Sequence, residues 1–299
     1  MKLSICVITM NRAEQLREAL DSCLKCDLPQ QTEFVVIDNA STDNTADVVR
    51  EVLNDIGFSY YYEKLPENLG VGGGRNYAYG KASGDFVYML DDDAVIDYES
   101  TPYFFKYAIE ILKKHENIAT LTTQIYDTSW ERNRLEAGKK KISEDLFKCQ
   151  MFCGGSHFLR KSFFKREPYL PNKYGYEEIP PSLYVIDNGN VNAFCSSLLI
   201  IHKPLVDKWS LKDGKNYELL VKTIALQYAI KKIIYPRLFS PLLKLALWKR
   251  MRKYATNFSD FKKSVFKVVE DFNNEKYLLN KISFSTVIKM IFDFKLSAF

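Results

Sequence analysis

Three adjacent carboxylates, Asp91, Asp92 and Asp93, directly follow the apolar run 86–90. A strand that ends in such a cluster cannot bury all three charges without a counter-charge, because an unpaired buried charge is very costly. Hard divalent cations take oxygen ligands, and Mg²⁺ is usually held by one or two carboxylates together with substrate phosphates. The cluster therefore predicts a metal–diphosphate site, and a solvated acidic turn is the alternative interpretation.

Two further polar residues occupy the same place relative to their strands. Thr9 ends the predicted strand 3–9, and Asp38 ends the predicted strand 33–38. Ligands of open α/β sheets bind beyond the carboxyl ends of the strands, so we expect both residues on the same edge as the aspartates. A carboxylate at Asp38 can accept hydrogen bonds from a base or a ribose, although an Asx turn would also use it.

The glycine-rich segment 68–76, which includes Gly74, carries a single arginine, Arg75, to the start of a predicted helix. Glycines remove side chains that would block a phosphate or a sugar, and a helix N-terminus attracts anions. Arg75 can also pair with a phosphate or with the aspartates. The segment is not a Walker A loop, because no Gly-Lys-Ser/Thr follows, and it is not a dinucleotide fingerprint, because it does not follow the first strand.

Glu177 and Glu178 form a second carboxylate pair, in a segment rich in tyrosine and proline. Neighbouring acids split their pKa values, which can leave one of them poised as a general base. A helix N-terminal acid pair is the structural alternative. His202 ends the apolar strand predicted over 191–201, where its imidazole can complete a metal shell with Asp93 or serve a purely structural role.

Strand-like and helix-like segments alternate along the first hundred residues. Such alternation predicts an α/β fold with a doubly wound, mostly parallel sheet. The predicted strands are 3–9, 33–38, 59–63 and 85–90, and the predicted helices are 13–23, 46–53 and 75–82. Beyond residue 204 the pattern is helical. The N-terminal residues are predicted to form the first strand and not a signal peptide.

The net charge of +5 conceals two oppositely charged parts. Residues 1–202 hold 22 Lys and Arg against 29 Asp and Glu, whereas residues 203–299 hold 20 against 8. Within the basic part, segment 238–252 interleaves leucines and a tryptophan with lysines and arginines, which is typical of an interfacial helix at an anionic membrane. Nucleic acid is the other class of anionic partner, and a packing helix is the structural alternative.

Neither a membrane-spanning helix nor a disulfide framework is expected. No uncharged apolar run reaches the length of about 18 residues that a spanning helix needs. We interpret the six cysteines, which include a Cys23-x-x-Cys26 pair, as reduced cytosolic thiols in preference to zinc ligands or disulfides.

The order of these motifs resembles that of a known enzyme family. The motifs are Val7-Ile8-Thr9-Met10-Asn11-Arg12, Val36-Ile37-Asp38-Asn39-Ala40-Ser41-Thr42-Asp43, Asn68-Leu69-Gly70 with Gly74-Arg75-Asn76, Leu90-Asp91-Asp92-Asp93, Gly175-Tyr176-Glu177-Glu178, and His202. Over residues 1–204 the chain resembles a family 2 glycosyltransferase of the GT-A fold. The resemblance implies a GT-A catalytic domain over 1–204, followed by a basic helical tail over 205–299.

The resemblance also implies a reaction, the inverting transfer of a sugar from a nucleotide-diphosphate donor, a UDP- or dTDP-sugar. Mg²⁺ or Mn²⁺, held by Asp93, Asp91 and His202, would neutralise the leaving diphosphate. Glu178, or else Glu177, would deprotonate the acceptor hydroxyl. The nucleotide-sugar contacts that the resemblance implies are Thr9, Asn11, Arg12, Asp38, Asn68, Gly74, Arg75, Asp91 and Asp92.

The resulting expectation is a hexosyl- or deoxyhexosyltransferase that modifies a lipid-linked or polysaccharide acceptor in cell-surface polysaccharide synthesis. We expect it in the cytoplasm, peripheral at the inner face of the cell membrane through its tail, with no nucleic acid partner. A metal-dependent nucleotidyltransferase is one alternative, but it would normally place a basic glycine-rich loop soon after the first strand, and 8–13 has no glycine. A non-catalytic nucleotide- or membrane-binding module is the other, and it leaves the acidic residues without a role.

Overall fold

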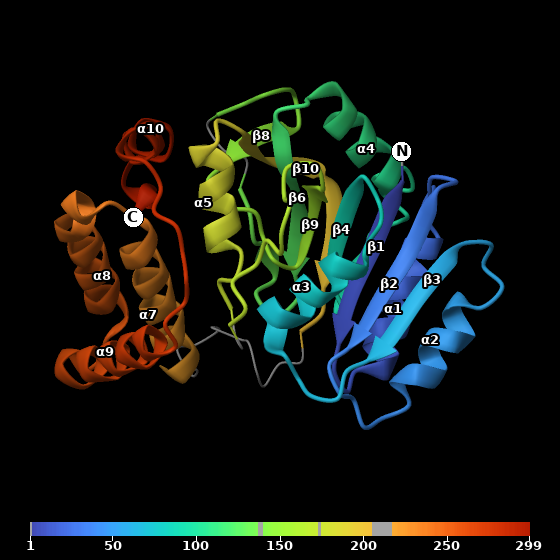
Figure 1. Ribbon diagram of the computed structural model, residues 1–299, viewed down its shortest axis with the longest axis horizontal. Helices are drawn as coiled ribbons and strands as arrows, with labels where there is room; N and C mark the ends of the chain where they lie inside the picture. The colour runs from blue at the N-terminus through green and yellow to red at the C-terminus, as the bar shows by residue number, and fades with distance from the viewer. Residues whose placement is uncertain (1, 137–139, 173–174, 205–216) are drawn as a thin grey trace.

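The structure is a computed structural model that describes residues 2–136, 140–172, 175–204 and 217–299 (Figure 1). The strands are β1 (Leu3–Thr9), β2 (Thr32–Asp38), β3 (Ser59–Lys64), β4 (Phe86–Asp91), β5 (Ala94–Ile96), β6 (Ile118–Asp127), β7 (Arg132–Asn133), β8 (Leu146–Cys149), β9 (Ser156–Arg160) and β10 (Val191–His202). The α-helices are α1 (Ala13–Leu24), α2 (Thr45–Leu53), α3 (Gly70–Lys81), α4 (Phe104–Lys114), α5 (Ile179–Asp187), α7 (Tyr217–Ile234), α8 (Ser240–Tyr254), α9 (Phe258–Asn274) and α10 (Phe284–Phe294). Two 3-10 helices, η2 (Arg237–Phe239) and η3 (Lys295–Ala298), lie among the C-terminal helices.

In the described residues these strands form one sheet with the order β3-β2-β1-β4-β9-β6-β10-β5. Strands β3, β2, β1 and β4 are parallel, as are β6 and β10, whereas β9 and β5 run antiparallel to their neighbours. The predicted α/β fold with a doubly wound, mostly parallel sheet is therefore confirmed. The antiparallel strands were not predicted, because short apolar strands carry little signal of direction.

Both faces of the sheet are covered at its centre, which is why strands β1, β2 and β4 are mostly apolar and buried. Leu3, Ile5 and Val7 of β1 face a core shared with helices α1, α2 and α4. Cys6, between them, faces the opposite core, which holds residues of α3 and α5. Because successive side chains of a strand alternate between faces, one strand serves two helical layers.

The antiparallel strand β5 brings two distant parts of the chain together. The chain turns back directly after Asp93, and β5 pairs with the end of β10, where Ala94 lies opposite His202. The parallel neighbour β6 places Asp127 opposite the same histidine. The amide of Lys203 also donates to the Asp93 carbonyl at 2.8 Å. This register fixes His202 beside two aspartates.

The C-terminal helices α7, α8, α9 and α10 form a separate group that packs on the side of α5 (Figure 1). Their buried side chains make a second hydrophobic core together with residues of α5, among them Ile179, Leu183 and Ile186. The predicted C-terminal helical region is confirmed, and α7 packs against α5, which links it to the part of the chain that forms the sheet. Among the described residues, no helix combines the length and the apolar character that crossing a bilayer requires.

Candidate active site

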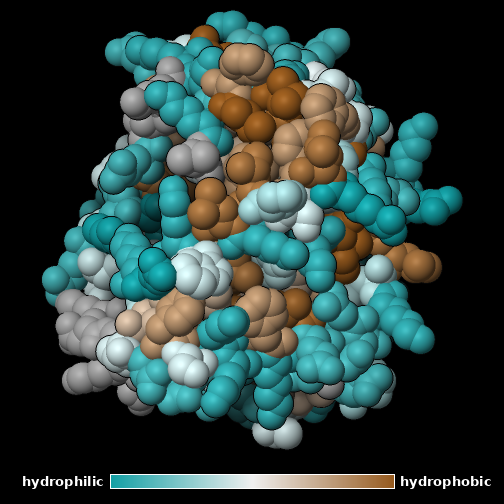
Figure 2. All heavy atoms as spheres, turned by 90° about the vertical axis from the view of Figure 1, so that its left-hand side faces the viewer, coloured by the Kyte–Doolittle hydropathy of each residue, from teal (hydrophilic) through white to brown (hydrophobic). Residues whose placement is uncertain are grey.

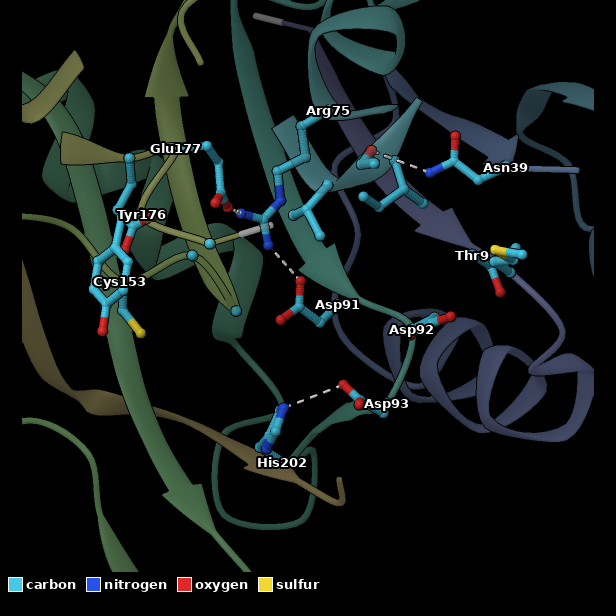
Figure 3. A pocket seen from close by; sticks show the side chains of 18 of the residues that line it. Thr9, Asn39, Arg75, Asp91, Asp92, Asp93, Cys153, Tyr176, Glu177 and His202 are labelled. Carbon is cyan, nitrogen blue, oxygen red and sulfur yellow. Dashed lines mark hydrogen bonds and ion pairs between the residues drawn. The ribbon is translucent and has the colours of Figure 1, made fainter. Parts of the chain in front are cut away.

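A cavity of about 540 Å³ opens at the carboxyl ends of β1, β4 and β10 (Figure 3). Thr9, Asp91 and His202, the last residues of these three strands, line it. The start of α3, the loop before α5, residues of segments 130–134 and 153–155, and one side of α7 also line it. The site thus lies where ligands of open α/β sheets bind, and its volume is in the range of small-molecule sites.

Arg75, on α3, is a buried hub between two acidic residues. Its guanidinium donates to Asp91 at 2.5 Å and to Glu177, which comes from the loop before α5. Burial acts to lower the pKa of Arg75, but the carboxylates of Asp91 and Glu177 outweigh it and raise that pKa. Arg75 therefore stays charged and joins α3, β4 and the loop before α5 into one rigid wall.

A glycine of α3 permits this close packing. A Cβ on Gly72 would lie 1.9 Å from the carbonyl oxygen of Leu170. No side chain fits there without moving the backbone of the 170 segment. The glycine-rich sequence is therefore used for helix-to-loop packing in addition to any role toward a ligand.

Arg12 is the second cation of the acidic cluster. Its guanidinium donates to Asp92 and to Asp93, each at 2.8 Å. Burial raises the pKa of Asp92 to about 6, which the Arg12 charge offsets only in part. The three aspartates are thus divided between two arginines from different helical segments, so the predicted acidic cluster is a buried network and not a solvated turn.

Asp91, Asp93 and His202 offer three ligand atoms within 4.8 Å of one another. His202 Nε2 lies 3.2 Å from Asp93, while Nδ1 lies 3.1 Å from Asp127 Oδ2. A metal-binding histidine commonly bonds a carboxylate through its other ring nitrogen, and Asp127 fills that place. Two carboxylates and one imidazole suit Mn²⁺ or Mg²⁺, so the residues fit a divalent cation.

His202 and the aspartates beside it also shift one another's pKa values. Burial acts to lower the pKa of His202, but its hydrogen bonds to Asp127 and Asp93 outweigh burial and raise that pKa. Burial acts to raise the pKa of Asp93, but its hydrogen bond with His202 outweighs burial and lowers it. The protonated histidine therefore offsets one of the two aspartate charges beside it.

Glu178 lies on the cavity wall directly before α5, and its surroundings differ from those of Glu177. No described basic side chain forms an ion pair with it, and burial together with the adjacent Glu177 raises its pKa well above the ordinary carboxyl value. Helix α5 continues with Pro180 and Pro181 in its first turn. Glu178 is thus the carboxylate in this pair that can take up a proton near neutral pH.

The backbone before the glutamate pair is held in an unusual conformation. Gly175 and Tyr176 have φ angles of 76° and 64°, in the left-handed region that a bulky residue such as tyrosine rarely adopts. The Tyr176 hydroxyl lies near the polar side chains of Thr223 and Gln227 of α7, and its ring packs against the second core. Helix α7 therefore fixes the loop that carries the two glutamates.

Three buried polar atoms on the cavity wall have no hydrogen-bond partner among the described residues. They are Thr9 Oγ1, Asn39 Oδ1 and Glu177 Oε2. Buried polar groups are nearly always hydrogen-bonded in folded proteins, so these atoms mark places where a bound molecule would supply the partner.

The sequence model of one protein family, described as Glycosyl transferase family 2, matches residues 4–167, which is more than half of the chain. The chain belongs to glycosyl transferase family 2. The matched range holds the aspartate cluster, Arg75 and Arg12. The matched range ends before Glu177, Glu178 and His202. These three residues are assigned to the site from the structure and from the sequence motifs.

Curated relatives of this family 2 member match over shorter stretches. The poly(ribitol-phosphate) beta-N-acetylglucosaminyltransferase TarS of Staphylococcus aureus is 36% identical over 102 residues, which are 33% of this chain and 18% of that protein. A GalNAc(5)-diNAcBac-PP-undecaprenol beta-1,3-glucosyltransferase of Campylobacter jejuni is 36% identical over 92 residues, 31% of this chain and 29% of that protein. The chain thus matches less than a third of the length of either relative.

Solved structures extend the likeness to the whole fold. The structure of S. aureus TarS residues 1–349 in complex with UDP-GlcNAc aligns with a TM-score of 0.64 at 18% identity, covering 100% of this chain and 89% of that one. A mannosyltransferase of Pyrobaculum calidifontis in complex with GDP-Man and Mn²⁺ aligns with a TM-score of 0.62 at 15% identity, covering 100% and 81%. The chain has the GT-A fold with a C-terminal helical region, as the resemblance implied.

The structure brings most of the predicted site residues of this family 2 glycosyltransferase to one cavity. The residues in its wall are Thr9, Arg12, Asn68, Arg75, Asp91, Asp92, Asp93, Glu177, Glu178 and His202. Among the described residues, Asn11, Asp38 and Gly74 are predicted contacts that do not line it. Both oxygens of the Asp38 carboxylate already accept bonds, from the amide of Ser41 at 2.6 Å and from the hydroxyl of Tyr62 at 2.9 Å.

Other residues of the cavity were not predicted. Asn39 lies in the wall where Asp38 was expected, and Arg134 and Trp130 enter from the segment after β6. Asp127, which supports His202, ends β6, so the strand-end rule that singled out Asp38 could have found it. The sequence offers no comparable signal for the α7 residues Leu219 and Thr223, because a helix far along the chain gives no indication of what it covers.

Proposed function

We propose that this protein transfers a hexosyl or related sugar from a nucleotide-diphosphate donor to an acceptor hydroxyl, with inversion at the anomeric carbon. One observation carries the proposal. A trio of residues suited to a divalent cation and a carboxylate of raised pKa meet in one cavity at the strand ends. This is the pair of groups that departure of a diphosphate and attack by a hydroxyl each require.

The donor side of the cavity is the proposed nucleotide site. Thr9, Asn39 and Asn68 offer polar groups toward a base and ribose, and Arg12 and Arg75 add positive charge beside the aspartates. Asp91, Asp93 and His202 would hold Mg²⁺ or Mn²⁺. When bound, the metal ion would act as a Lewis acid that stabilises negative charge on the leaving diphosphate.

The acceptor side is the proposed base site. Glu178 would accept the proton of the acceptor hydroxyl while that oxygen forms its bond to the anomeric carbon and the bond from that carbon to the diphosphate breaks. A single displacement of this kind inverts the anomeric centre. Glu177 would act as a positioning residue, because its ion pair with Arg75 fixes the loop that carries Glu178.

The kinds of donor and acceptor are proposed from the relatives. The names of matched proteins include a glucosyl transfer to an undecaprenol-linked glycan and an N-acetylglucosaminyl transfer to poly(ribitol-phosphate). These names support a UDP-sugar donor, with a dTDP-sugar as the alternative, and a lipid-linked or polysaccharide acceptor of cell-surface synthesis. We propose that residues 1–204 form the catalytic domain and that the basic part, 205–299, holds the enzyme at the inner face of the membrane.

Calorimetric titration with UDP, dTDP and GDP, each with and without Mn²⁺, tests the proposal. We expect one nucleotide to bind tightly only with Mn²⁺, because the diphosphate and the acidic trio would share the ion. Asp93→Ala should remove this metal-dependent binding. Asp47→Ala, which changes an exposed aspartate of α2 that pairs only with Arg50, is the matched control and should bind as the unsubstituted protein does.

Two results would contradict the proposal. Equal binding with and without Mn²⁺ would remove the metal site from the mechanism. No binding of any of the three nucleotides, by a protein whose thermal unfolding is normal, would favour a non-catalytic module.

A further inference from the structure

Helix α8 is apolar on two opposite sides. Leu243, Leu247 and Met251 point inward and are buried in the second core. A second apolar row, which we call the outer row, consists of Leu238 in η2 and Leu242, Leu245 and Trp248 in α8. These four side chains are between 39% and 72% exposed, and their spacing of three and four residues places them along one side of a helix.

The sequence segment that contains the outer row is strongly basic. Residues 219–259 contain nine lysines and arginines and no aspartate or glutamate. On α8 itself, Lys244, Lys249 and Arg252 are exposed. The Arg252 guanidinium lies 4.1 Å from the centre of the Trp248 ring, so cation and apolar side chain occupy the same surface.

The apolar surface continues beyond α8. Phe284, at the start of α10, is half exposed, and its ring lies 5.2 Å from that of Phe239, which precedes α8. Figure 2 looks at the side of the molecule that these helices form, and hydrophobic side chains gather there among hydrophilic ones. Such a contiguous apolar patch on a soluble surface marks a contact with a partner.

We propose that the outer row of α8 lies in the headgroup region of an anionic lipid bilayer, with its lysines and arginines on lipid phosphates. This deepens the proposed membrane association by assigning it to one helix face. It rests on no part of the proposed sugar transfer. An interfacial helix buries an apolar face into the boundary of headgroups and chains while basic residues contact anionic lipids, and α8 offers both.

Charge complementarity selects this partner over two others. A two-fold contact of α8 with a second copy would place its cations against one another with no acid between them, because such a contact joins identical surfaces. Nucleic acid would match the cations, but its phosphate backbone offers nothing that buries four exposed apolar side chains. A bilayer of anionic lipids satisfies both the charge and the apolar row.

Sedimentation of the full chain with lipid vesicles tests the proposal. We expect binding to vesicles of phosphatidylglycerol and phosphatidylcholine and weak binding to phosphatidylcholine alone. Leu238→Ser/Leu245→Ser should weaken binding to the anionic vesicles at least tenfold. Lys244→Glu/Lys249→Glu should weaken it further, since each basic residue near an anionic surface contributes roughly fivefold in affinity.

A matched control separates the helix face from overall charge. Lys165→Glu/Arg166→Glu changes the net charge equally at two exposed residues of the catalytic body and should bind vesicles almost normally. An equal loss in this control, or no vesicle binding by the unsubstituted protein, would overturn the proposal. So would concentration-dependent dimers that Leu238→Ser/Leu245→Ser abolishes, since they would make a second copy the partner. Nucleotide binding by all three variants shows separately that the catalytic cavity is intact.

Discussion

Glu177 and Glu178 are adjacent in sequence, but their side chains have opposite electrostatic surroundings. Glu177 is buried against the Arg75 cation, which fixes it. Glu178 faces the cavity, and burial and its acidic neighbour raise its pKa. We therefore expect Glu178 to act as the general base and Glu177 to act as a positioning residue.

We predict that Glu178→Gln lowers kcat by about 10²–10⁴-fold with little change in donor affinity, because it removes the proton acceptor and keeps the shape. Glu177→Gln leaves the buried Arg75 with one counter-charge fewer and should lower thermal stability as well as activity. Initial rates with a nucleotide-sugar and melting curves of both variants give the comparison. If Glu177→Gln alone abolished turnover while the protein stayed stable, the assignment within the pair would be reversed.

The raised pKa of Glu178 also sets the sign of two pH effects. A general base must be ionised, so kcat should rise with pH through this elevated pKa and not through the ordinary carboxyl range. The folded protein holds a proton that the unfolded chain releases, so this group's contribution to stability is lost as pH rises through the folded-state pKa. Glu178→Gln should remove that loss and unfold at an equal or higher temperature than the unsubstituted protein at alkaline pH.

Residue types with chemistry could be read from the sequence, but their contacts could not. The Asp91–Asp93 cluster and Arg75 lie in the cavity because strand ends and helix starts face the same edge of an α/β sheet. Asp38 satisfies the same rule, yet its carboxylate is used by Ser41 and Tyr62. Asn39 lines the cavity, whereas the carboxylate of the adjacent Asp38 lies in a hydrogen-bond network beside it. The bend of the turn after β2 determines which of the two residues faces the cavity.

At the scale of elements, the loop before α5 is anchored from two sides. Arg75 of α3 fixes it through Glu177, and the Tyr176 side chain packs against the second core, to which α7 contributes. Tyr176 keeps its left-handed backbone only because these contacts compensate a conformational cost of about 1–3 kcal/mol. The loop that carries the two glutamates thus packs against a helix more than forty residues later in the sequence.

We predict that Tyr176→Phe lowers kcat about fivefold with an unchanged KM for the donor, because polar interactions of the hydroxyl with Thr223 and Gln227, worth about 1 kcal/mol, are lost while the ring remains. Tyr184→Phe on α5 is the matched control, since it removes a hydroxyl that donates to the carbonyl of Asn280 at 3.0 Å and lies outside the cavity wall. Steady-state kinetics of both variants give the result. A similar fall in kcat for both would reduce Tyr176 to a general stabilising residue.

Elements were predicted well where local pattern decides them. Helix α1 and strands β1 and β2 follow the apolar periodicity of their segments, because each buries a regular face. The antiparallel pairing of β5 with β10, which brings His202 to Asp93, has no such signal. Three residues of strand pair with a segment about a hundred residues later, and only tertiary packing selects that partner.

For the whole molecule, the second core joins the C-terminal helices to α5. Leu183 and Ile186 of α5 pack on one side with side chains of α7 to α10, while Val185 faces the core under the sheet. Helix α5 is therefore shared between the two cores. The charge division near residue 204 is a feature of the sequence, and the packing of α5 with the C-terminal helices could not be inferred from charge.

We predict that the full chain unfolds in a single cooperative transition and that Leu183→Ala lowers its free energy of unfolding by about 2–5 kcal/mol, the usual cost of a cavity at a buried leucine. Urea unfolding followed by far-ultraviolet circular dichroism and by nucleotide binding tests both statements. Two separated transitions, with nucleotide binding surviving the first, would show that the C-terminal helices unfold on their own.

The two prolines at the start of α5 have a consequence for the proton affinity of Glu178. A helix start normally presents free amide groups, which would bond to a nearby carboxylate and make it a weaker base. Here the first-turn positions Pro180 and Pro181 have no amide hydrogen, and the amides of Ile179 and Ser182 already donate to the carbonyls of Tyr176 and Glu178. The helix therefore holds the carboxylate in place without offering it a first-turn donor. Glu178 is thus fixed at a helix start, where a carboxylate usually becomes a weaker base, and it still has a raised pKa.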